Sequence, residues 1–316
     1  MEEAQNVPTE KWETDSRLPE HLIPLHYDLW LHPDLKTEIF NGHVKILIKA
    51  KAATNYFLVH IRNLTVTETK LYSQTGDEIL IKSSSEHTGH EFWVTKLSKT
   101  VSAGRYSLYM KFNGSLTNGL SGFYKSVYKN DDGKVVPIAS SKFQPTDARK
   151  AFPCFDEPAF RATFSVILVR PTSGYIALSN MPVQTEVHNS PSKGKMIARN
   201  SHLKIIIDYL RIFEGLVEVF FQKSVPMSTY LACFIVCDFE FEEKMSDVHK
   251  TKFRVYAAPN QKHRIKYALE VGANISDFFV DYFNISYPLP KQDMIAIPDF
   301  RAGAMEHWGL ITYRSD

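Results

Sequence analysis

The last stretch of the chain holds the clearest arrangement for chemistry, because residues 297–314 combine small residues with a single glutamate, Glu306. Gly303 and Ala304 carry almost no side chain, so another extended chain can lie against their backbone. Glu306 lies just after the small residues that the other chain would contact. The pattern predicts edge-on pairing with a peptide whose free ammonium is held by the carboxylate. Taken alone, the same residues also describe a glycine turn with a solvated glutamate.

Asp156, Glu157 and Gln144 also have side chains suited to chemistry, but their pattern favours structural roles. Asp156 and Glu157 are sequence neighbours, and nothing in the pattern makes their carboxyl groups converge. We therefore reject a catalytic carboxylate pair and expect Arg149 to form an ion pair with one of them. Gln144 stands directly before a proline, a combination that on its own is typical of a turn.

No motif for a catalytic metal occurs in the sequence. A zinc site of the H-E-x-x-H type needs two histidines one helical turn apart, so that both face one metal ion. His90-Glu91 is followed by Phe92-Trp93-Val94, which supplies no second histidine and is typical of a strand. The sequence alone therefore predicts no metal ligands in this chain.

Several segments resemble a known family. Gly303-Ala304-Met305-Glu306-His307 is similar to the exopeptidase motif Gly-Ala-Met-Glu-Asn of the gluzincin zinc aminopeptidases, the aminopeptidase N and oxytocinase type. The segment from Gln144 to Pro158 resembles the other long signature of that family. Shorter matches lie at residues 177–182, 227–231 and 287–291. They follow the family order from about residue 18 to residue 314, so the resemblance covers most of the chain. It identifies the chain as the front portion of such an enzyme.

The resemblance assigns roles to particular residues. It implies that Glu306 anchors the substrate α-ammonium, and that Gln144 supports the same ammonium and borders the first side-chain pocket. Gly303, Ala304 and Met305 would offer backbone groups and apolar contact to the peptide. A charge-assisted bond of roughly 1.5–3 kcal/mol at the anchor separates a free N-terminus from an internal peptide bond. Zinc is implied as the cofactor of the complete enzyme, with its ligands outside this sequence.

His307 departs from the family motif, which has Asn at this position. An Asn is neutral at every working pH, whereas a His gains a charge near its unperturbed pKa of about 6.5. An imidazolium beside the anchor would repel an ammonium and compete for Glu306. One hypothesis is therefore that peptide affinity falls below about pH 6.5. The alternative is that the side chain points away and the substitution is tolerated.

The elements that must position these residues are mostly strands. Apolar and polar residues alternate over residues 25–32, 44–49, 105–112, 164–168 and 253–257, which predicts short, half-buried strands. From Gln261 to Phe283 the apolar period becomes helical, with Asn260 as the expected N-cap. Residues 293–297 then return to a strand. The pattern predicts a mainly β chain: an antiparallel β-rich domain, followed by a helix and strands.

Domain limits follow from these changes in pattern. We expect a disordered polar tail over residues 1–17, a β-rich domain over 18–258 and an incomplete second domain over 259–316. The resemblance describes the first domain as saddle-like and the second as the start of an α+β, thermolysin-like catalytic domain. Residues 193–214 interrupt the family pattern and carry an apolar helical stripe. They are interpreted as a variant insertion or mistranslated segment, with a partner-binding helix as the alternative.

Net charge, cysteine spacing and glycosylation motifs limit which partners and which cellular location can be proposed. A net charge of +2 over 316 residues gives no reason to propose a nucleic acid or an anionic membrane as partner. Cys233 and Cys237 lie on one predicted strand too far apart to pair, so we expect buried free thiols. Four glycosylation acceptor sequences start at Asn63, Asn113, Asn274 and Asn284. They favour an extracellular or luminal address, with the cytoplasm as the alternative. Any membrane anchor would come from a segment absent here.

The sequence therefore predicts the N-terminal portion of a zinc metallo-aminopeptidase that removes N-terminal residues from peptides. Its part in that function would be to hold the free N-terminus of the substrate. The chain alone is expected to be inactive because the metal motif is missing. The rival hypothesis is a truncated, non-catalytic peptide-binding or regulatory form that keeps the anchor.

Overall fold

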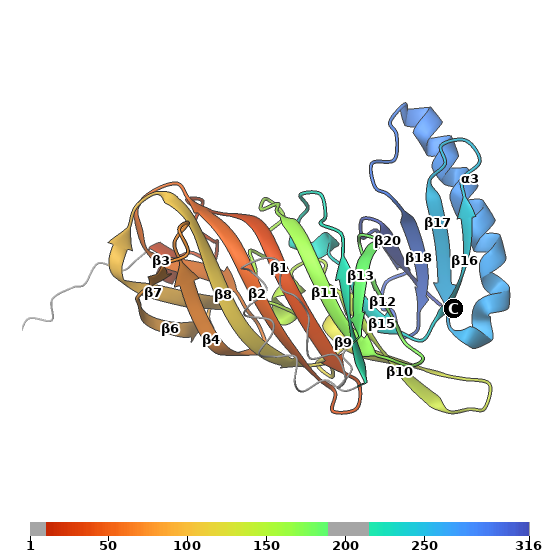
Figure 1. The fold of residues 1–316 in the computed structure, drawn as a ribbon, viewed down its shortest axis with the longest axis horizontal. Helices are drawn as coiled ribbons and strands as arrows, with labels where there is room; N and C mark the ends of the chain where they lie inside the picture. The colour runs from red at the N-terminus through yellow and green to blue at the C-terminus, as the bar shows by residue number, and fades with distance from the viewer. Residues whose placement is uncertain (1–10, 189–214, 316) are drawn as a thin grey trace, which may run out of the picture.

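The computed structural model describes residues 11–188 and 215–315. Most of these residues form strands, arranged in four sheets, with one long helix near the C-terminus (Figure 1). This confirms the predicted mainly β fold with a helix near the end of the chain. The segment 193–214 lies outside the described residues.

The largest sheet contains eight strands from the N-terminal part of the chain, between residues 22 and 221. They are β1 (Leu22–Asp34), β2 (Ile39–Ala50), β4 (Leu64–Tyr72), β5 (Glu78–Ile79), β8 (Gly104–Ser115), β11 (Thr163–Pro171), β13 (Val183–His188) and β14 (Leu216–Phe221). Their order is β13-β14-β11-β1-β2-β8-β4-β5. All neighbours are antiparallel except β1 and β11, which run parallel. Along β2 the burial alternates residue by residue, as expected for a strand with one face on a core.

Two smaller sheets complete the N-terminal part. One holds β3 (Thr54–His60), β7 (Phe92–Val101) and β6 (Ile81–His87), in that order. The other holds β12 (Ile176–Ser179), β15 (Phe234–Cys237), β10 (Val135–Lys142) and β9 (Gly122–Lys129), also in that order. Short 3₁₀ turns, η1 (Ala148–Lys150) and η2 (Thr229–Leu231), lie between strands. β15 is fully buried, and Cys233 and Cys237 are free and buried as predicted.

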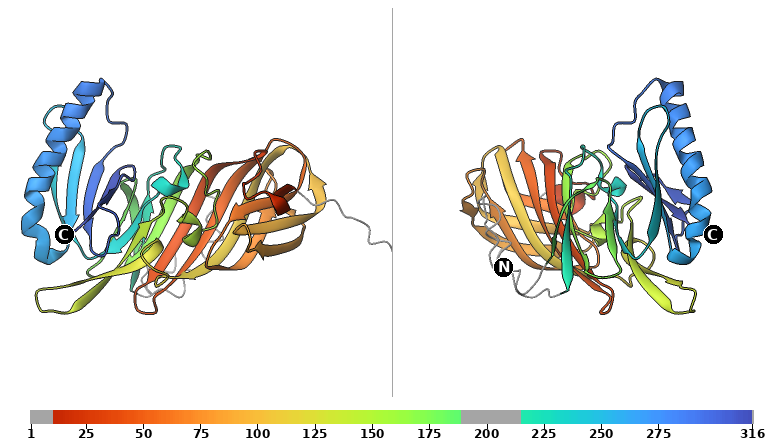
Figure 2. Two further views of the ribbon diagram at one scale, coloured as in Figure 1. Left: turned by 180° about the vertical axis from the view of Figure 1, so that it is seen from behind. Right: turned by 45° about the vertical axis from the view of Figure 1, so that its right-hand side comes forward.

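The C-terminal part is a five-stranded sheet covered by the long helix. It contains β16 (Glu240–Met245), β17 (Lys252–Ala257), β18 (Gln292–Ile297), β20 (Leu310–Arg314) and β19 (Ala304–Met305), in that order. Helix α3 (Ile265–Phe283) follows a 3₁₀ turn, η3 (Pro259–Arg264). Both views in Figure 2 show α3 on the outer face of this sheet, away from the N-terminal sheets. The expected helix is therefore present.

Asn260 does not cap this helix. Its Nδ2 donates to the carbonyl of Lys129 at 2.9 Å, and no side chain caps the start of η3 or α3. Pro259 stands at the first position of η3, where its fixed φ starts the turn without a side-chain acceptor. The expected cap was wrong because the proline begins the helical segment earlier.

The described part of the expected tail is ordered. Residues 11–14 form a helical turn, α1 (Lys11–Thr14), and Trp12 is buried against Tyr56 and His87. The Lys96 ammonium lies 5.2 Å from the centre of the Trp12 ring. Within the range expected to be a tail, one large aromatic side chain, Trp12, thus packs against the β-rich part of the molecule.

The sheet topology also bears on where the boundary between the two domains lies. β16 and β17 precede Ala258, yet they belong to the C-terminal sheet, where β17 pairs in parallel with β18. The change of hydrophobic period near Pro259 therefore marks where the helix begins, not where the sheet begins. The main core also extends into the C-terminal part, since it includes the buried Ile295, Met305 and Leu310.

Candidate peptide-binding site

Glu306 lies at the end of a short edge strand. β19 pairs antiparallel with β20, with Ala304 opposite Tyr313 and Met305 opposite Thr312. β19 is the last strand of its sheet, so among the described residues its other edge has no partner strand. Strand alternation sends the Met305 side chain into the core and leaves Glu306 exposed. The anchor predicted from sequence is therefore accessible to solvent.

The backbone beside Glu306 is open on this side. A Cβ placed on Gly303 would meet nothing within 4 Å, and Ala304 is exposed. The carbonyl of Gly303 accepts a hydrogen bond from the Arg314 backbone N–H at 3.0 Å, so the segment is nevertheless fixed in position. This is the combination that an incoming extended peptide requires: a fixed strand with an uncovered edge.

The turn after Glu306 is held by the N-terminal part of the molecule. Asn180 Nδ2 donates to the carbonyls of Trp308 and Leu231, each at 2.8 Å. Gly309 has a φ of +78°, and a Cβ there would approach the Asn180 carbonyl oxygen to 2.3 Å. Only glycine fits this close approach. The turn that follows Glu306 therefore packs directly against a residue of the β domain.

A buried lysine reinforces this contact. Lys291 Nζ donates to the carbonyls of Ser179 and Gly309 at 2.9 and 2.7 Å and pairs with Asp293 at 2.8 Å. All three hydrogens of the ammonium are thus used. Burial lowers the pKa of Lys291, and Asp293 opposes this effect. Because a buried charge is tolerated only when paired and hydrogen-bonded, this arrangement fixes the turn firmly.

Gln144 lies two residues after the end of strand β10. Phe143 is fully buried, whereas Gln144 is exposed. The backbone carbonyl of Gln144 accepts a hydrogen bond from Lys142 Nζ at 2.9 Å. Lys142 also interacts electrostatically with Glu306, which links the end of β10 to the end of β19. The structure thus brings the region of Gln144 and the region of Glu306 together from two different sheets.

Lys142 is a residue that the sequence analysis missed. Burial lowers the pKa of its ammonium, while the carboxylates of Asp147 and Glu306 act in the opposite direction. Lys142 is the last residue of β10, and Gln144 lies in the turn that follows. The sequence carried no signal for Lys142, because its nearness to Glu306 comes from a different sheet.

His307 is buried next to the exposed Glu306. Its Nδ1 lies 3.4 Å from Thr312 Oγ1, and its Nε2 has no hydrogen-bond partner among the described residues. The pKa of the imidazole is lowered to about 3, first by burial and then by the charge of Lys142. The ring is therefore neutral at working pH. The expectation that it becomes charged near pH 6.5 fails because the unperturbed pKa does not apply to a desolvated ring.

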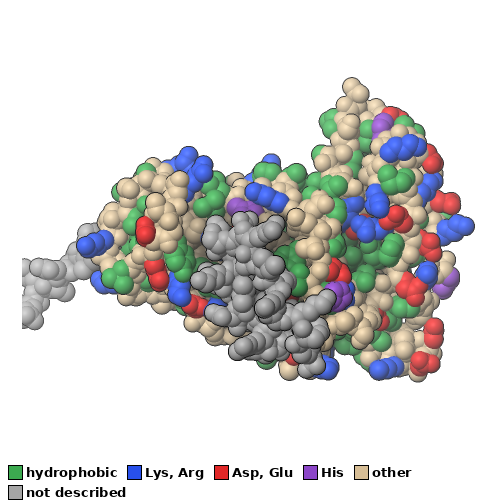
Figure 3. Space-filling model, in the orientation of Figure 1, with side chains coloured by type: hydrophobic (Ala, Val, Ile, Leu, Met, Phe, Trp, Pro, Cys, Tyr) green, Lys and Arg blue, Asp and Glu red, His purple; other side chains and the backbone are tan. Residues whose placement is uncertain are grey.

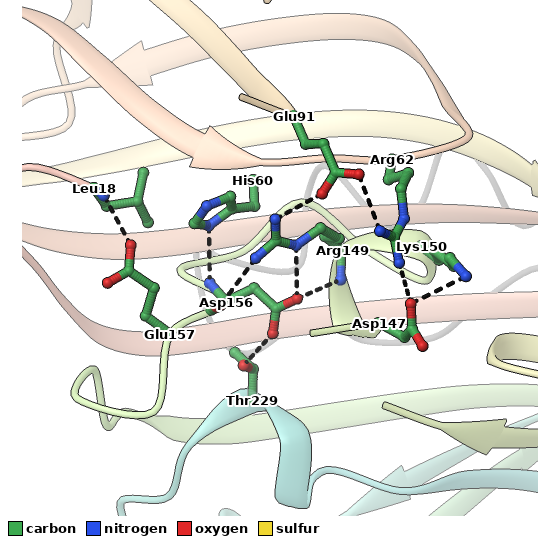
Figure 4. A network of polar contacts seen from close by, with 10 residues as sticks. All are labelled: Leu18, His60, Arg62, Glu91, Asp147, Arg149, Lys150, Asp156, Glu157 and Thr229. Carbon is green, nitrogen blue, oxygen red and sulfur yellow. Dashed lines mark hydrogen bonds and ion pairs between the residues drawn. The ribbon is translucent and has the colours of Figure 1, made fainter. Parts of the chain in front are cut away.

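The segment after Gln144, residues 147–156, is held by a network of ion pairs (Figure 4). Arg149 Nε donates to Asp156 Oδ2 at 2.9 Å, and Arg149 Nη1 donates to Glu91 Oε2 at 2.7 Å. Glu91 in turn pairs with Arg62, which also binds Asp147. The predicted pairing of Arg149 with one of the two neighbouring acids is confirmed.

The two neighbouring acids do not converge. The second oxygen of Asp156 accepts from Thr229 Oγ1 at 2.8 Å, and Glu157 accepts from the Leu18 backbone N–H at 2.8 Å (Figure 4). Asp156 is 2% exposed and fully hydrogen-bonded, so it has no free oxygen for chemistry. Rejecting a catalytic pair from sequence was sound, since the carboxylates bind different partners in the structural framework.

The described residues gather no group of three or more His, Cys, Asp or Glu side chains that could hold a metal ion. These residues therefore do not fit a zinc site. Within the same ranges, no helix is both long enough and apolar enough to cross a membrane.

Comparison with known proteins defines the class. The Peptidase M1 N-terminal domain family matches residues 23–199, and the Peptidase family M1 domain matches residues 267–316. The chain therefore belongs to the M1 peptidase family and covers its N-terminal part. The order of the two matches agrees with the β-rich part preceding the helix-covered sheet.

Individual relatives are aminopeptidases. Human endoplasmic reticulum aminopeptidase 1 is 38% identical over 94% of this chain, and porcine (Sus scrofa) glutamyl aminopeptidase is 38% identical over 95%. Aminopeptidase A of Gloydius brevicauda is 40% identical over 98%. The matched regions amount to 29%, 30% and 30% of those relatives, so the chain spans about three tenths of their length.

Proposed function

We propose that this chain is the part of an aminopeptidase that recognises the free N-terminus of a peptide. Glu306 accepts the α-ammonium, and Gln144 borders the first residue of the peptide. The observation that carries the proposal is the geometry of β19: an edge strand of the sheet, fixed by β20, that ends in an exposed carboxylate. The aminopeptidase names of the relatives support it.

The proposed binding mode is strand addition. An extended peptide pairs with the free edge at Gly303 and Ala304, and its first residue reaches Glu306. The buried Met305 and the contacts of Asn180 and Lys291 keep this edge from moving when the peptide binds. A preformed edge lowers the ordering cost of binding, so even a short peptide retains affinity.

The complete protein is proposed to release N-terminal residues from peptides, with zinc as its cofactor. The chain alone is proposed to bind peptides without cleaving them, because its sequence contains no H-E-x-x-H motif. A non-catalytic peptide-binding form is the alternative, and it makes the same prediction for this chain. Both the aminopeptidase function and the non-catalytic alternative therefore depend on the same anchor at Glu306.

The anchor is tested by measuring peptide binding to the purified chain by calorimetry. A peptide with a free N-terminus should bind, and its N-acetylated form should bind about tenfold or more weakly. Glu306→Gln should weaken binding of the peptide with a free N-terminus by a similar factor, since the charge-assisted bond contributes about 1.5–3 kcal/mol. Glu86→Gln, an exposed glutamate on β6, is the control and should leave binding unchanged.

Equal affinity for free and acetylated peptides would contradict the proposal. So would a Glu306→Gln variant that binds as tightly as the original chain while melting at the same temperature. Hydrolysis of an aminoacyl amide by the purified chain, together with about one retained zinc ion per chain, would contradict the proposed inactivity of this portion.

A further inference from the structure

The charge balance around Glu306 points to the kind of peptide that fits. Glu306 contributes one negative charge, and Lys142 contributes a positive charge that interacts with it. An arriving α-ammonium adds a second positive charge. Because Lys142 is half-buried, this like-charge contact is screened less than at an open surface. A peptide bearing no further charge therefore leaves a net positive cluster.

Lys142 has hydrogen-bonding capacity to spare. Its Nζ donates to the Gln144 carbonyl at 2.9 Å, and the described residues place no carboxylate oxygen within 4.0 Å of it. An ammonium has three hydrogens, so two remain for a ligand. Asp147, which also faces Lys142 electrostatically, is already paired with Arg62 and Lys150. The cation is therefore held in place without a dedicated anion.

The position of Lys142 suits the first side chain of a bound peptide. The carbonyl that fixes its ammonium belongs to Gln144, the residue proposed to border that side chain. The neighbouring His307 is buried and supplies no negative charge to compensate Lys142. We infer that Lys142 makes this site select peptides whose first residue is acidic, an inference that rests on the proposed function.

The test compares peptides that differ only in the first residue. Tetrapeptide amides beginning with Glu, Gln or Lys are titrated into the purified chain, and amidation leaves the first side chain of the Glu peptide as its only carboxylate. The Glu peptide should bind about five- to tenfold more tightly than the Gln peptide, as expected for one charge-assisted contact. The Lys peptide should bind most weakly.

Variants assign the preference to one side chain. Lys142→Gln should make the Glu and Gln peptides equal, and Lys142→Glu should shift the preference to the Lys peptide. Lys134→Gln, which removes an exposed lysine just before β10, is the matched control and should keep the original order. Thermal melts of each variant verify folding, and the peptide series on the unmodified chain stands even if a variant misfolds.

The outcomes separate this inference from the proposed function. Equal binding of the Glu and Gln peptides, or a preference that persists in folded Lys142→Gln, overturns the inference alone, provided that binding still requires a free N-terminus and Glu306. Binding that ignores N-acetylation or Glu306→Gln overturns the proposed function. No binding of any peptide overturns the proposed function, and the inference falls with it.

Discussion

At the scale of single residues, burial decides what a side chain contributes. Glu306 and His307 are adjacent and follow β19 directly, yet Glu306 is exposed and His307 is only 1% exposed. The carboxylate is therefore available to a ligand, while the imidazole is desolvated and neutral. The departure from the family motif at His307 thus bears on the stability of the chain rather than on the charge at the anchor.

His307 should make the chain less stable in acid. Its pKa is about 3 when folded and near 6.5 when unfolded, so the unfolded chain binds more protons between these values. The stabilisation from the neutral ring is complete above pH 6.5 and is lost as the pH falls toward 3. We expect His307→Asn to reduce the pH slope of the unfolding free energy by up to about 1.4 kcal/mol per pH unit in this window.

Urea unfolding at several pH values from 7 to 4 measures this slope. The half-buried His43 and the buried His60 also have lowered pKa values, but they are common to both proteins and cancel in the comparison. His263→Asn, which replaces an exposed histidine, is the control. A His307→Asn slope that follows the original chain throughout would show that the ring is not desolvated.

At the scale of elements, strand pairing rather than order along the chain determines which sheet a strand joins. β16 and β17 come before the helix, but β17 pairs with β18, with Phe253 opposite Gln292 and Tyr256 opposite Ile295. We therefore propose a boundary near Asp238, between β15 and β16, in place of the one expected near Ala258. The C-terminal sheet has its own small core under α3, including Phe253, Leu269 and Met294.

Hydrogen exchange should reveal this unit. We expect the amides of β17 and β18 to lose protection together, since each strand supplies hydrogen bonds to the other. Strands β1 and β2, at the centre of the large sheet, serve as the reference. Exchange measured on proteolytic fragments decides the boundary. Protection of residues 252–257 that persists after residues 292–297 have exchanged would return the boundary to Ala258.

At the scale of the whole molecule, the surface carries two further signals. Charges of both signs are interspersed over the C-terminal part in the view of Figure 3. Helix α3 exposes large apolar side chains along a groove of about 870 Å³, among them Phe279 and Phe283.

Three of the four predicted glycosylation acceptors are accessible: Asn63, Asn274 and Asn284. The luminal or extracellular address expected from these acceptor sequences stays a prediction. The chain isolated from its native cells should lose mass on treatment with peptide N-glycosidase. Ser286→Ala removes one acceptor sequence while keeping Asn284, which ends α3 in a left-handed conformation. Unchanged mass after treatment would contradict this address.

The sequence by itself determined the strands, the helix and the family, because hydrophobic period and motif order are local properties of the chain. It also predicted Arg149 as the partner of an adjacent acid. This feature depends on residue type and on nearness along the chain. The membership of β16 and β17 in the C-terminal sheet was not visible in this way, since pairing with β18 is a contact across 39 residues of sequence, from Phe253 to Gln292.

Tertiary structure decided the charge of His307 and the environment of the anchor. An unperturbed pKa describes a solvated ring, and only packing shows that His307 is desolvated. Likewise, Lys142 is an ordinary strand residue in the sequence and becomes part of the site when β10 and β19 meet. Electrostatic interactions depend on distance in space, so the contacts that set the chemistry of this site arise only when the two sheets pack.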